Sequence, residues 1–256
     1  MMIIKKIVLA AILFCSTTGI SQGRPAKPPC KILTATFNML TGNAMIYTFS
    51  YNGSRITSMQ STKEKIVFTF DGMGYLIKTE KIDLKNNSVY ITMDFTNNTQ
   101  GKLIDQKRTI GTTKEWFTYQ YNATGKLTDV IYKTFSNIMY QLVSSYKLNW
   151  TGNNVTEVVK HNGAGTPICW TNYTYDTSRT NKFNKDFAFF TNAEFFLSIE
   201  STAKYLSENE ILSIKDPCQG ATTFMNTNRV FNQSGYPMNT DFLVLPTYLQ
   251  FTYDCN

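Results

Sequence analysis

Apolar and polar residues alternate along most of this chain, in short runs that end at turn residues. The clearest run is residues 117–121, in which three aromatic residues alternate with Thr118 and Gln120. A period of two places the rings on one face of a β-strand and the polar side chains on the other. Residues 122–125 then include Asn and Gly, which tolerate positive φ, and the chain returns as residues 127–132. The stretch predicts a β-hairpin.

Looser copies of this hairpin follow one another along the chain. Most are about 25 residues apart, as in repeated units that bury their apolar faces only by lying side by side. Consecutive hairpins pair antiparallel, and strand twist curls the sheet. The predicted fold is all-β, a long curled antiparallel meander in the form of an open half-barrel or spiral sheet. The last aromatic residues before the turns are Tyr51, Phe70, Phe95, Tyr121, Trp150, Tyr175, Phe231 and Tyr253, and Asp71-Gly72 is the expected turn after Phe70.

Residues 181–220 interrupt this repeat. Their first half is rich in phenylalanine, and Phe196, Ile199, Ala203 and Leu206 follow at helical spacing. We expect one short helical insert here. It either plugs the curled sheet or covers a ligand groove as a lid.

The N-terminus has the features of a secretory signal peptide. Lysines precede the apolar run at residues 7–15, which is far shorter than the roughly 20 residues needed to span a bilayer. We therefore expect a secreted or periplasmic protein with no transmembrane span in the mature chain. The predicted boundaries are 1–21 for the signal peptide, 22–31 for an N-terminal tether and 32–256 for a single β-repeat domain.

The five cysteines bear on both anchoring and redox state. Cys15 lies in the signal peptide, and a lipid anchor there is disfavoured because bulky Phe14 stands where a small residue is needed. A metal site is not expected, since the other cysteines are far apart in sequence and His161 is the only histidine. No cofactor is predicted. The four cysteines of the mature chain predict two disulfides in an oxidising compartment, with three pairings open: Cys30, Cys169, Cys218 and Cys255.

The formal net charge of +7 invites a nucleic-acid interpretation, but the charges are mixed. Between residues 63 and 114, basic residues such as Lys81 and Arg108 are interleaved with acidic ones such as Glu64. This pattern is typical of a solvated sheet surface rather than a phosphate track. We expect no nucleic-acid partner.

Catalytic constellations are scarce. His161 is expected in a glycine-containing loop, so a catalytic triad would depend on a single loop position. The carboxylates that could form a glycosidase pair, such as Asp94, Asp105, Asp129 and Glu157, occupy outward strand positions beside Lys and Thr. We predict no catalytic residue and no enzymatic activity.

Aromatic side chains are the best candidates for a binding surface. Trp116, Trp150, Trp170 and Tyr173 could line a sheet face that stacks on a ligand. Most such rings are expected in the core, because they share a face with apolar neighbours. Trp116 is the exception, since it alternates with Phe117 and so points to the opposite face. It is the strongest candidate for an exposed contact.

The motif aromatic-x-Tyr-Asn/Asp-x-x-Gly-x-aliphatic, as at residues 119–127, resembles the tyrosine–aspartate (YD) repeats of Rhs-type proteins. More closely, the layout resembles uncharacterised secreted bacterial proteins with degenerate YD-like β-hairpin repeats, over residues 33–255. The resemblance implies that residues 32–256 form one YD-like β-repeat domain. Rhs encapsulation and self-cleavage are not implied, because the chain has too few units and lacks the Pro-x-x-Gly-Leu-Asn motif.

These features together predict a non-enzymatic binding or structural module of the cell envelope. Its partner would be a protein, glycan or lipid of the envelope, which the residues do not identify. The alternative is a half-barrel carrier for a lipid or lipoprotein, with the Phe-rich insert covering the groove. A continuous apolar cavity beneath residues 187–196 would favour the carrier.

Overall fold

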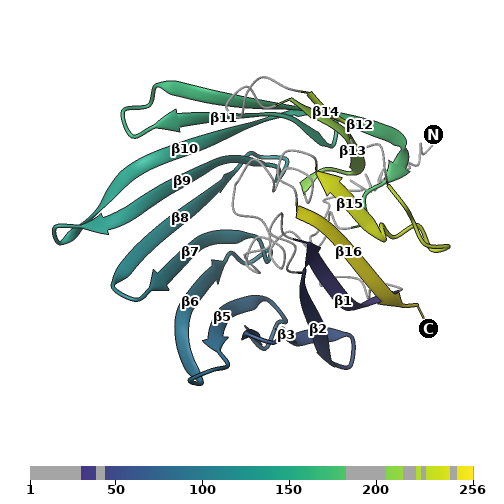
Figure 1. Cartoon of the computed structure of the whole chain (residues 1–256). Coiled ribbons are helices and arrows are strands. Elements are labelled where there is room, and N and C mark those ends of the chain that lie inside the picture. Colours follow the sequence, from purple (N-terminus) through teal and green to yellow (C-terminus); the bar gives the residue numbers. More distant parts are fainter. Residues whose placement is uncertain are drawn as a thin grey trace, which may run out of the picture.

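The computed structural model describes residues 30–38, 44–182, 206–215, 223–225, 229–242 and 247–255. Within them, sixteen strands form one antiparallel sheet (Figure 1). The strands are β1 Lys31–Asn38, β2 Ala44–Asn52, β3 Arg55–Gln60, β4 Glu64–Phe70, β5 Leu76–Asp83, β6 Ser88–Asn97, β7 Leu103–Ile110, β8 Thr113–Tyr121, β9 Leu127–Ser136, β10 Met139–Thr151, β11 Asn154–Asn162, β12 Pro167–Thr180, β13 Asn209–Lys215, β14 Thr223–Met225, β15 Asn239–Phe242 and β16 Thr247–Asp254.

The strand order is that of a meander. From β1 to β14 each strand pairs with the next one in the chain. The last strand, β16, pairs with the other side of β1, and β15 pairs with β16. Among the described strands, β14 and β15 are therefore the two ends of a curled sheet that does not close into a barrel (Figure 1). The predicted all-β curled antiparallel meander is confirmed.

Residues 229–238 join the two sides of the curled sheet. Arg229 Nη2 lies 3.2 Å from Asp176 Oδ2 on β12. On the other side of this segment, the backbone N–H of Phe251 in β16 donates to the carbonyl oxygen of Met238 at 2.8 Å. The segment therefore bridges β12 and β16, which lie far apart in the strand order.

Disulfide bonds reinforce this arrangement. Cys30 is bonded to Cys255 across a sequence separation of 225, next to the pair β1 and β16. Closing so long a loop stabilises a fold by about 5 kcal/mol through the entropy of the unfolded chain. Cys169 is also disulfide-bonded. The pairing of Cys218 lies outside the described residues.

The apolar faces of the hairpins meet on the inner side of the curled sheet. Tyr51, Phe70, Tyr121, Trp150 and Tyr175, five of the residues that mark the repeat, all pack against one hydrophobic core. Burial follows the two-residue period, as in β6, where the buried positions are two apart. Each buried ring contributes roughly 1.5–3 kcal/mol relative to an exposed one. The expectation of one shared apolar layer is confirmed.

Among the described connections, five are the same turn. In the turn at Asn122, the Gly125 N–H donates to the Asn122 carbonyl at 2.9 Å. Asn122 Oδ1 accepts from the N–H groups of Thr124 and Lys126, each at 3.0 Å. Gly125 has a φ of 80°, which glycine adopts without a steric penalty. The same bonds begin at Asp71, Asn98, Asn162 and Asn232.

The turn after Phe70 contains Asp71-Gly72, as expected, and its backbone bonds join Asp71 to Gly74 and Tyr75. The residue with positive φ in this turn is Gly74, at 89°. The Asp71 side chain accepts the backbone N–H groups of Met73 and Tyr75.

Rings that precede turns are bonded to the preceding hairpin. Tyr121 Oη donates to the carbonyl of Leu103, the first residue of β7, at 2.8 Å. The ammonium of Lys102, one position earlier, lies 5.3 Å from the centroid of the Tyr121 ring. This bond joins the neighbouring strands β7 and β8 and so links one hairpin to the next. The same bonds join Tyr51 to Ile32, Trp150 to Leu127, Tyr175 to Val155 and Tyr253 to Pro237.

These bonds lie at one end of the strands, which we call the stitched rim. It comprises the turns at residues 53–54, 71–75, 98–102, 122–126 and 152–153. The other end is called the opposite rim and comprises the turns at residues 61–63, 84–87, 111–112, 137–138 and 163–166.

The predicted insert is only partly described. Most of the predicted helix at residues 196–206 lies outside the described residues, as does the Phe-rich stretch before it. β13, which falls inside the stretch assigned to the insert, pairs with β12 and is a strand of the sheet. No helix in the described part of the chain is long and apolar enough to span a bilayer.

Candidate functional site

Trp116 lies on the outer face of β8. Its neighbours Glu115 and Phe117 face inward, and Phe117 packs against the core. Trp116 pairs with Lys107 of β7 and Lys133 of β9. Its indole Nε1 donates to Asp105 Oδ1 at 2.7 Å, so the ring has a fixed orientation. The outward direction expected from the alternation is what the structure shows.

Two further rings extend from Trp116 on this face: Tyr140 contacts Trp116, and Phe135 contacts Tyr140. The centroid of the Tyr140 ring lies 5.3 Å from that of Trp116 and 5.3 Å from that of Phe135, in edge-to-face geometry both times. Phe135 and Tyr140 are cross-strand partners in β9 and β10. Such pairs contribute about 0.5–1.5 kcal/mol beyond the area they bury. We call Trp116, Phe135 and Tyr140 the aromatic cluster.

Lysines surround the aromatic cluster. The ammonium groups of Lys133 and Lys107 lie 4.7 Å and 5.7 Å from the centroid of the Trp116 ring. The ammonium of Lys114 lies 5.6 Å from the Phe135 ring. The aromatic cluster therefore lies beside lysine ammonium groups. Such a surface suits a partner that has both an apolar part and anionic groups.

The other predicted binding residues lie elsewhere. Trp150 packs against the core and donates Nε1 to the carbonyl of Leu127 at 2.8 Å. Tyr173 is buried in the same core. Trp170 is 49% exposed on β12, with β11 between it and the β10 strand of the cluster. The structure therefore brings together none of the four predicted residues.

Phe135 and Tyr140 were missed at the sequence level. Phe135 follows Lys133 by two residues, and this spacing does predict that the two side chains share a face of the strand. The link from Lys133 to Trp116 depends on the register between β8 and β9, which alternation does not supply.

Glu64 lies on the inner face near the opposite rim, where two tyrosines and a lysine surround its carboxylate; we call this group the Glu64 cluster. Glu64 accepts hydrogen bonds from the hydroxyls of Tyr47 and Tyr90, and Lys81 Nζ lies 3.2 Å from Glu64 Oε1. Burial acts to raise the pKa of Glu64, but the two tyrosine hydrogen bonds and Lys81 outweigh it, so the pKa is lowered. Burial and the bond to Glu64 raise the pKa of Tyr90 to about 12. Glu64 is therefore ionised and its phenol partners protonated at neutral pH.

Glu115 repeats this arrangement two hairpins further on. It is bonded to Arg108 Nε and accepts from Tyr132 Oη at 2.7 Å. Burial acts to raise the pKa of Glu115, and the bonds from Arg108 and Tyr132 lower it below its ordinary value. Burial and the bond to Glu115 raise the pKa of Tyr132 to about 12.

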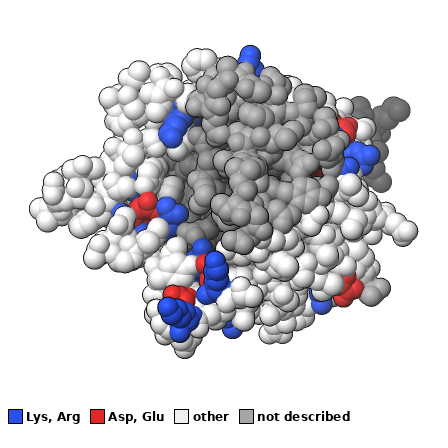
Figure 2. Space-filling view, in the orientation of Figure 1, with Lys and Arg blue, Asp and Glu red and all other residues white. Residues whose placement is uncertain are grey.

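The Glu64 and Glu115 clusters show that some of the interleaved charges do not lie on the solvated surface expected from the sequence. Glu64, Lys81 and Arg108 were expected on a solvated surface, but their side chains are only 13%, 17% and 23% exposed on the inner face. Partners of opposite charge and tyrosine hydroxyls compensate the lost hydration. The face seen in Figure 2 shows Lys and Arg next to Asp and Glu rather than one continuous basic patch.

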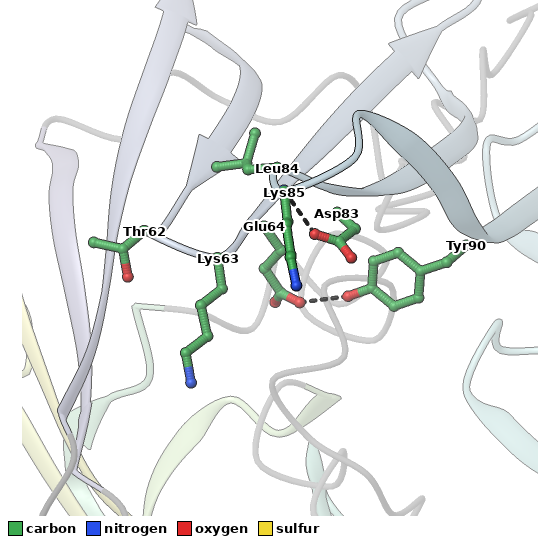
Figure 3. Close-up of a pocket in the computed structure, with 7 residues that line it drawn as sticks. All are labelled: Thr62, Lys63, Glu64, Asp83, Leu84, Lys85 and Tyr90. Carbon is green, nitrogen blue, oxygen red and sulfur yellow. Dashed lines mark hydrogen bonds between the residues drawn. The ribbon is translucent and has the colours of Figure 1, made fainter.

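A cavity of about 490 Å³ lies beside Glu64 (Figure 3). Its wall includes Tyr90, which donates to Glu64, and Asp83 Oδ1, which accepts from the Lys85 N–H at 2.8 Å. Four of the seven lining residues are charged, so an acyl chain in this cavity would lie against charged groups. The lining residues are Thr62, Lys63, Glu64, Asp83, Leu84, Lys85 and Tyr90.

The single histidine is not in a loop. His161 lies in β11 and pairs with Ser145 of β10 and Pro167 of β12. The expectation of a loop was wrong because the turn begins one residue later, at Asn162. In the part of the chain that the structure describes, no group of three or more His, Cys, Asp or Glu side chains could hold a metal ion.

No protein-family model matches the sequence, and no curated protein matches it. The structure is similar to a porin-like protein from Bacteroides uniformis ATCC 8492, with a TM-score of 0.59, 11% sequence identity, and coverage of 88% of this chain and 98% of that chain. At this identity the similarity shows the fold alone. A TcdB2–TccC3–Cdc42 complex matches at 11% identity over 77% of this chain and 12% of that chain, and its TM-score of 0.21 supports no conclusion.

Proposed function

We propose that this protein is a non-enzymatic binding and structural module of the cell envelope, secreted or periplasmic, that contacts its partner through the aromatic cluster. One observation carries the proposal: Tyr140 contacts both Trp116 and Phe135 on the outer face, outside the core that stabilises the sheet. Clustered aromatic side chains next to cations are typical anchors of binding interfaces.

The proposed location rests on the cysteines and the N-terminus. The Cys30–Cys255 bond and the disulfide of Cys169 suit a compartment that is oxidising. The leader-like residues 1–21 would direct the chain there. The partner is a protein, glycan or lipid of the envelope.

The test compares two tryptophan variants of the mature chain in cosedimentation with purified envelope fragments. Trp116→Ala is expected to lower the affinity by about thirtyfold, as for a central interface anchor. Trp170→Ala, which removes an exposed tryptophan from another part of the outer face, is the matched control and is expected to bind as the wild type does. Native mass spectrometry of the washed complex identifies the bound component. Equal binding by both variants would refute the assignment of the surface.

The carrier alternative has less support. It requires an apolar cavity, and four of the seven residues that line the cavity beside Glu64 are charged. Residues 187–196, which would cover such a cavity, lie outside the described residues. A lipid that copurifies with both tryptophan variants in equal amounts would favour the carrier.

A further inference from the structure

The hairpin of β9 and β10 carries apolar side chains beyond the aromatic cluster into solvent. Ile138 at its tip is 90% exposed and Met139 is 60% exposed, and Leu142 and Val143 are each 43% exposed. The hairpin projects past the β7–β8 turn beside it (Figure 1). Large apolar side chains gathered at one projecting tip are typical of interaction sites.

The backbone conformation at the tip is unfavourable for a large side chain such as that of Ile138. Asn137 and Ile138, the two residues between β9 and β10, have φ values of 47° and 74°. Tight turns of this kind favour Asn and Gly, and a β-branched residue with positive φ is strained. Folding alone would therefore favour glycine at position 138. The chain instead holds a large apolar side chain in water at a steric penalty.

The end of the β9–β10 hairpin carries no acidic side chain, and Asp105, the carboxylate beside the aromatic cluster, accepts a hydrogen bond from the Trp116 indole. Residues 130–146 contain no Asp or Glu. Lys133 lies over Trp116, and Lys114 lies over Phe135, so two ammonium groups flank the hairpin behind its apolar tip. Behind the apolar tip, aromatic rings and lysines lie side by side at one level. This arrangement matches a bilayer, in which the acyl chains lie below an interface that holds aromatic rings and anionic headgroups.

We propose that the β9–β10 hairpin is a membrane-surface anchor for bilayers that contain anionic lipid. Ile138 and Met139 enter the boundary between headgroups and acyl chains, Trp116 and Tyr140 lie at headgroup level, and the two lysines contact lipid phosphates. The inference rests on the proposed binding surface and assigns its partner as a lipid surface.

The first experiment measures cosedimentation of the mature chain with vesicles. One set contains phosphatidylcholine with phosphatidylglycerol as a minor component, and the other contains phosphatidylcholine alone. The affinity is expected to fall roughly tenfold without phosphatidylglycerol, as for the loss of the attraction of two lysines to an anionic surface. Lys114→Glu combined with Lys133→Glu should remove the preference for phosphatidylglycerol.

The second experiment separates the side chain at the tip from the stability of the fold. Ile138→Gly is expected to lower the affinity for the anionic vesicles about tenfold, as when one large apolar side chain no longer leaves water. Because glycine fits the positive φ, this variant should unfold at the same temperature as the wild type or a higher one. Met139→Ser should also weaken binding. Met73→Ser, which removes a methionine of similar exposure, 58%, from the stitched rim, should not.

The outcomes separate this inference from the proposed function. Vesicle binding that Ile138→Gly leaves unchanged, or no vesicle binding at all, overturns the anchor. If envelope fragments still bind through Trp116 while pure lipid vesicles do not, the anchor is wrong and the partner is a protein or glycan. If neither fragments nor vesicles bind, both proposals fail.

Discussion

At the stitched rim, one hairpin after another repeats the same contacts: Lys102 over Tyr121 and Lys126 over Trp150, with each ring bonded to the preceding hairpin. At the opposite rim one inner-face arrangement recurs, since Glu64 and Glu115 each bind a tyrosine and a cation, but the turns and their exposed side chains differ from one hairpin to the next. One holds Glu64 between tyrosines and Lys81, and another ends in exposed Ile138. The contrast indicates that the stitched rim maintains the fold, which leaves side chains at the opposite rim free to vary. A binding surface is therefore expected at the opposite rim or beside it.

The largest expected effect is at the Glu64 cluster. Glu64→Gln removes the carboxylate charge that pairs with Lys81 and accepts from two tyrosines, which should lower the free energy of unfolding by about 2 kcal/mol. This is less than for a fully buried pair, because solvent screens the site in part. Glu80→Gln in the more exposed pair with Lys78 is the control and should change it by less than about 0.5 kcal/mol. Urea unfolding at neutral pH measures both, and equal effects would mean that the inner cluster adds no stability.

The same cluster predicts a pH dependence. The folded-state pKa of Glu64 is lowered, so its contribution is fully present above the unfolded pKa of about 4.3 and is lost as the pH falls through the folded pKa. The stability advantage of wild type over Glu64→Gln should therefore begin to shrink as the pH falls below about 4.3, and the two should converge once the pH is below the folded-state pKa of Glu64. Thermal unfolding over a series of acidic buffers tests this, and a constant difference would contradict it.

A smaller difference between variant and control is expected for the glycines of the two rims. A Cβ at Gly125 would lie 2.1 Å from Lys102 Nζ, and the residue has a φ of 80°. Gly125→Ala should therefore cost about 2 kcal/mol, since it combines backbone strain with displacement of the lysine from its place over Tyr121. Gly111 at the opposite rim also has a positive φ, 56°, but nothing lies within 4 Å of its Cβ position. Gly111→Ala should cost about 1 kcal/mol, and an equal loss in both variants would show that the stitching contacts contribute little.

The secondary structure was largely predictable from local patterns. Tyr119 and Tyr121 alternate with polar residues, and Asn122 and Gly125 mark the turn that follows, so the hairpin follows from neighbouring residues alone. The shared core followed as well, because rings at one phase of the repeat must face the same side. The aromatic cluster was only half predictable. Trp116 stands between inward-facing residues of β8, so the sequence alone places it outside the core. Its partner Tyr140 belongs to a strand two positions away in the sheet, which the sequence does not reveal.

By itself the sequence determined the hairpins, their antiparallel order and the inward direction of their rings, because alternation and turn chemistry act over a few residues. Only the tertiary structure decided that β16 pairs with β1, that Cys30 bonds to Cys255, and that Glu64 faces inward with Tyr47 and Tyr90. These contacts join residues that are distant in the chain. They depend on the register and curl of the whole sheet, and neither is encoded in any one hairpin.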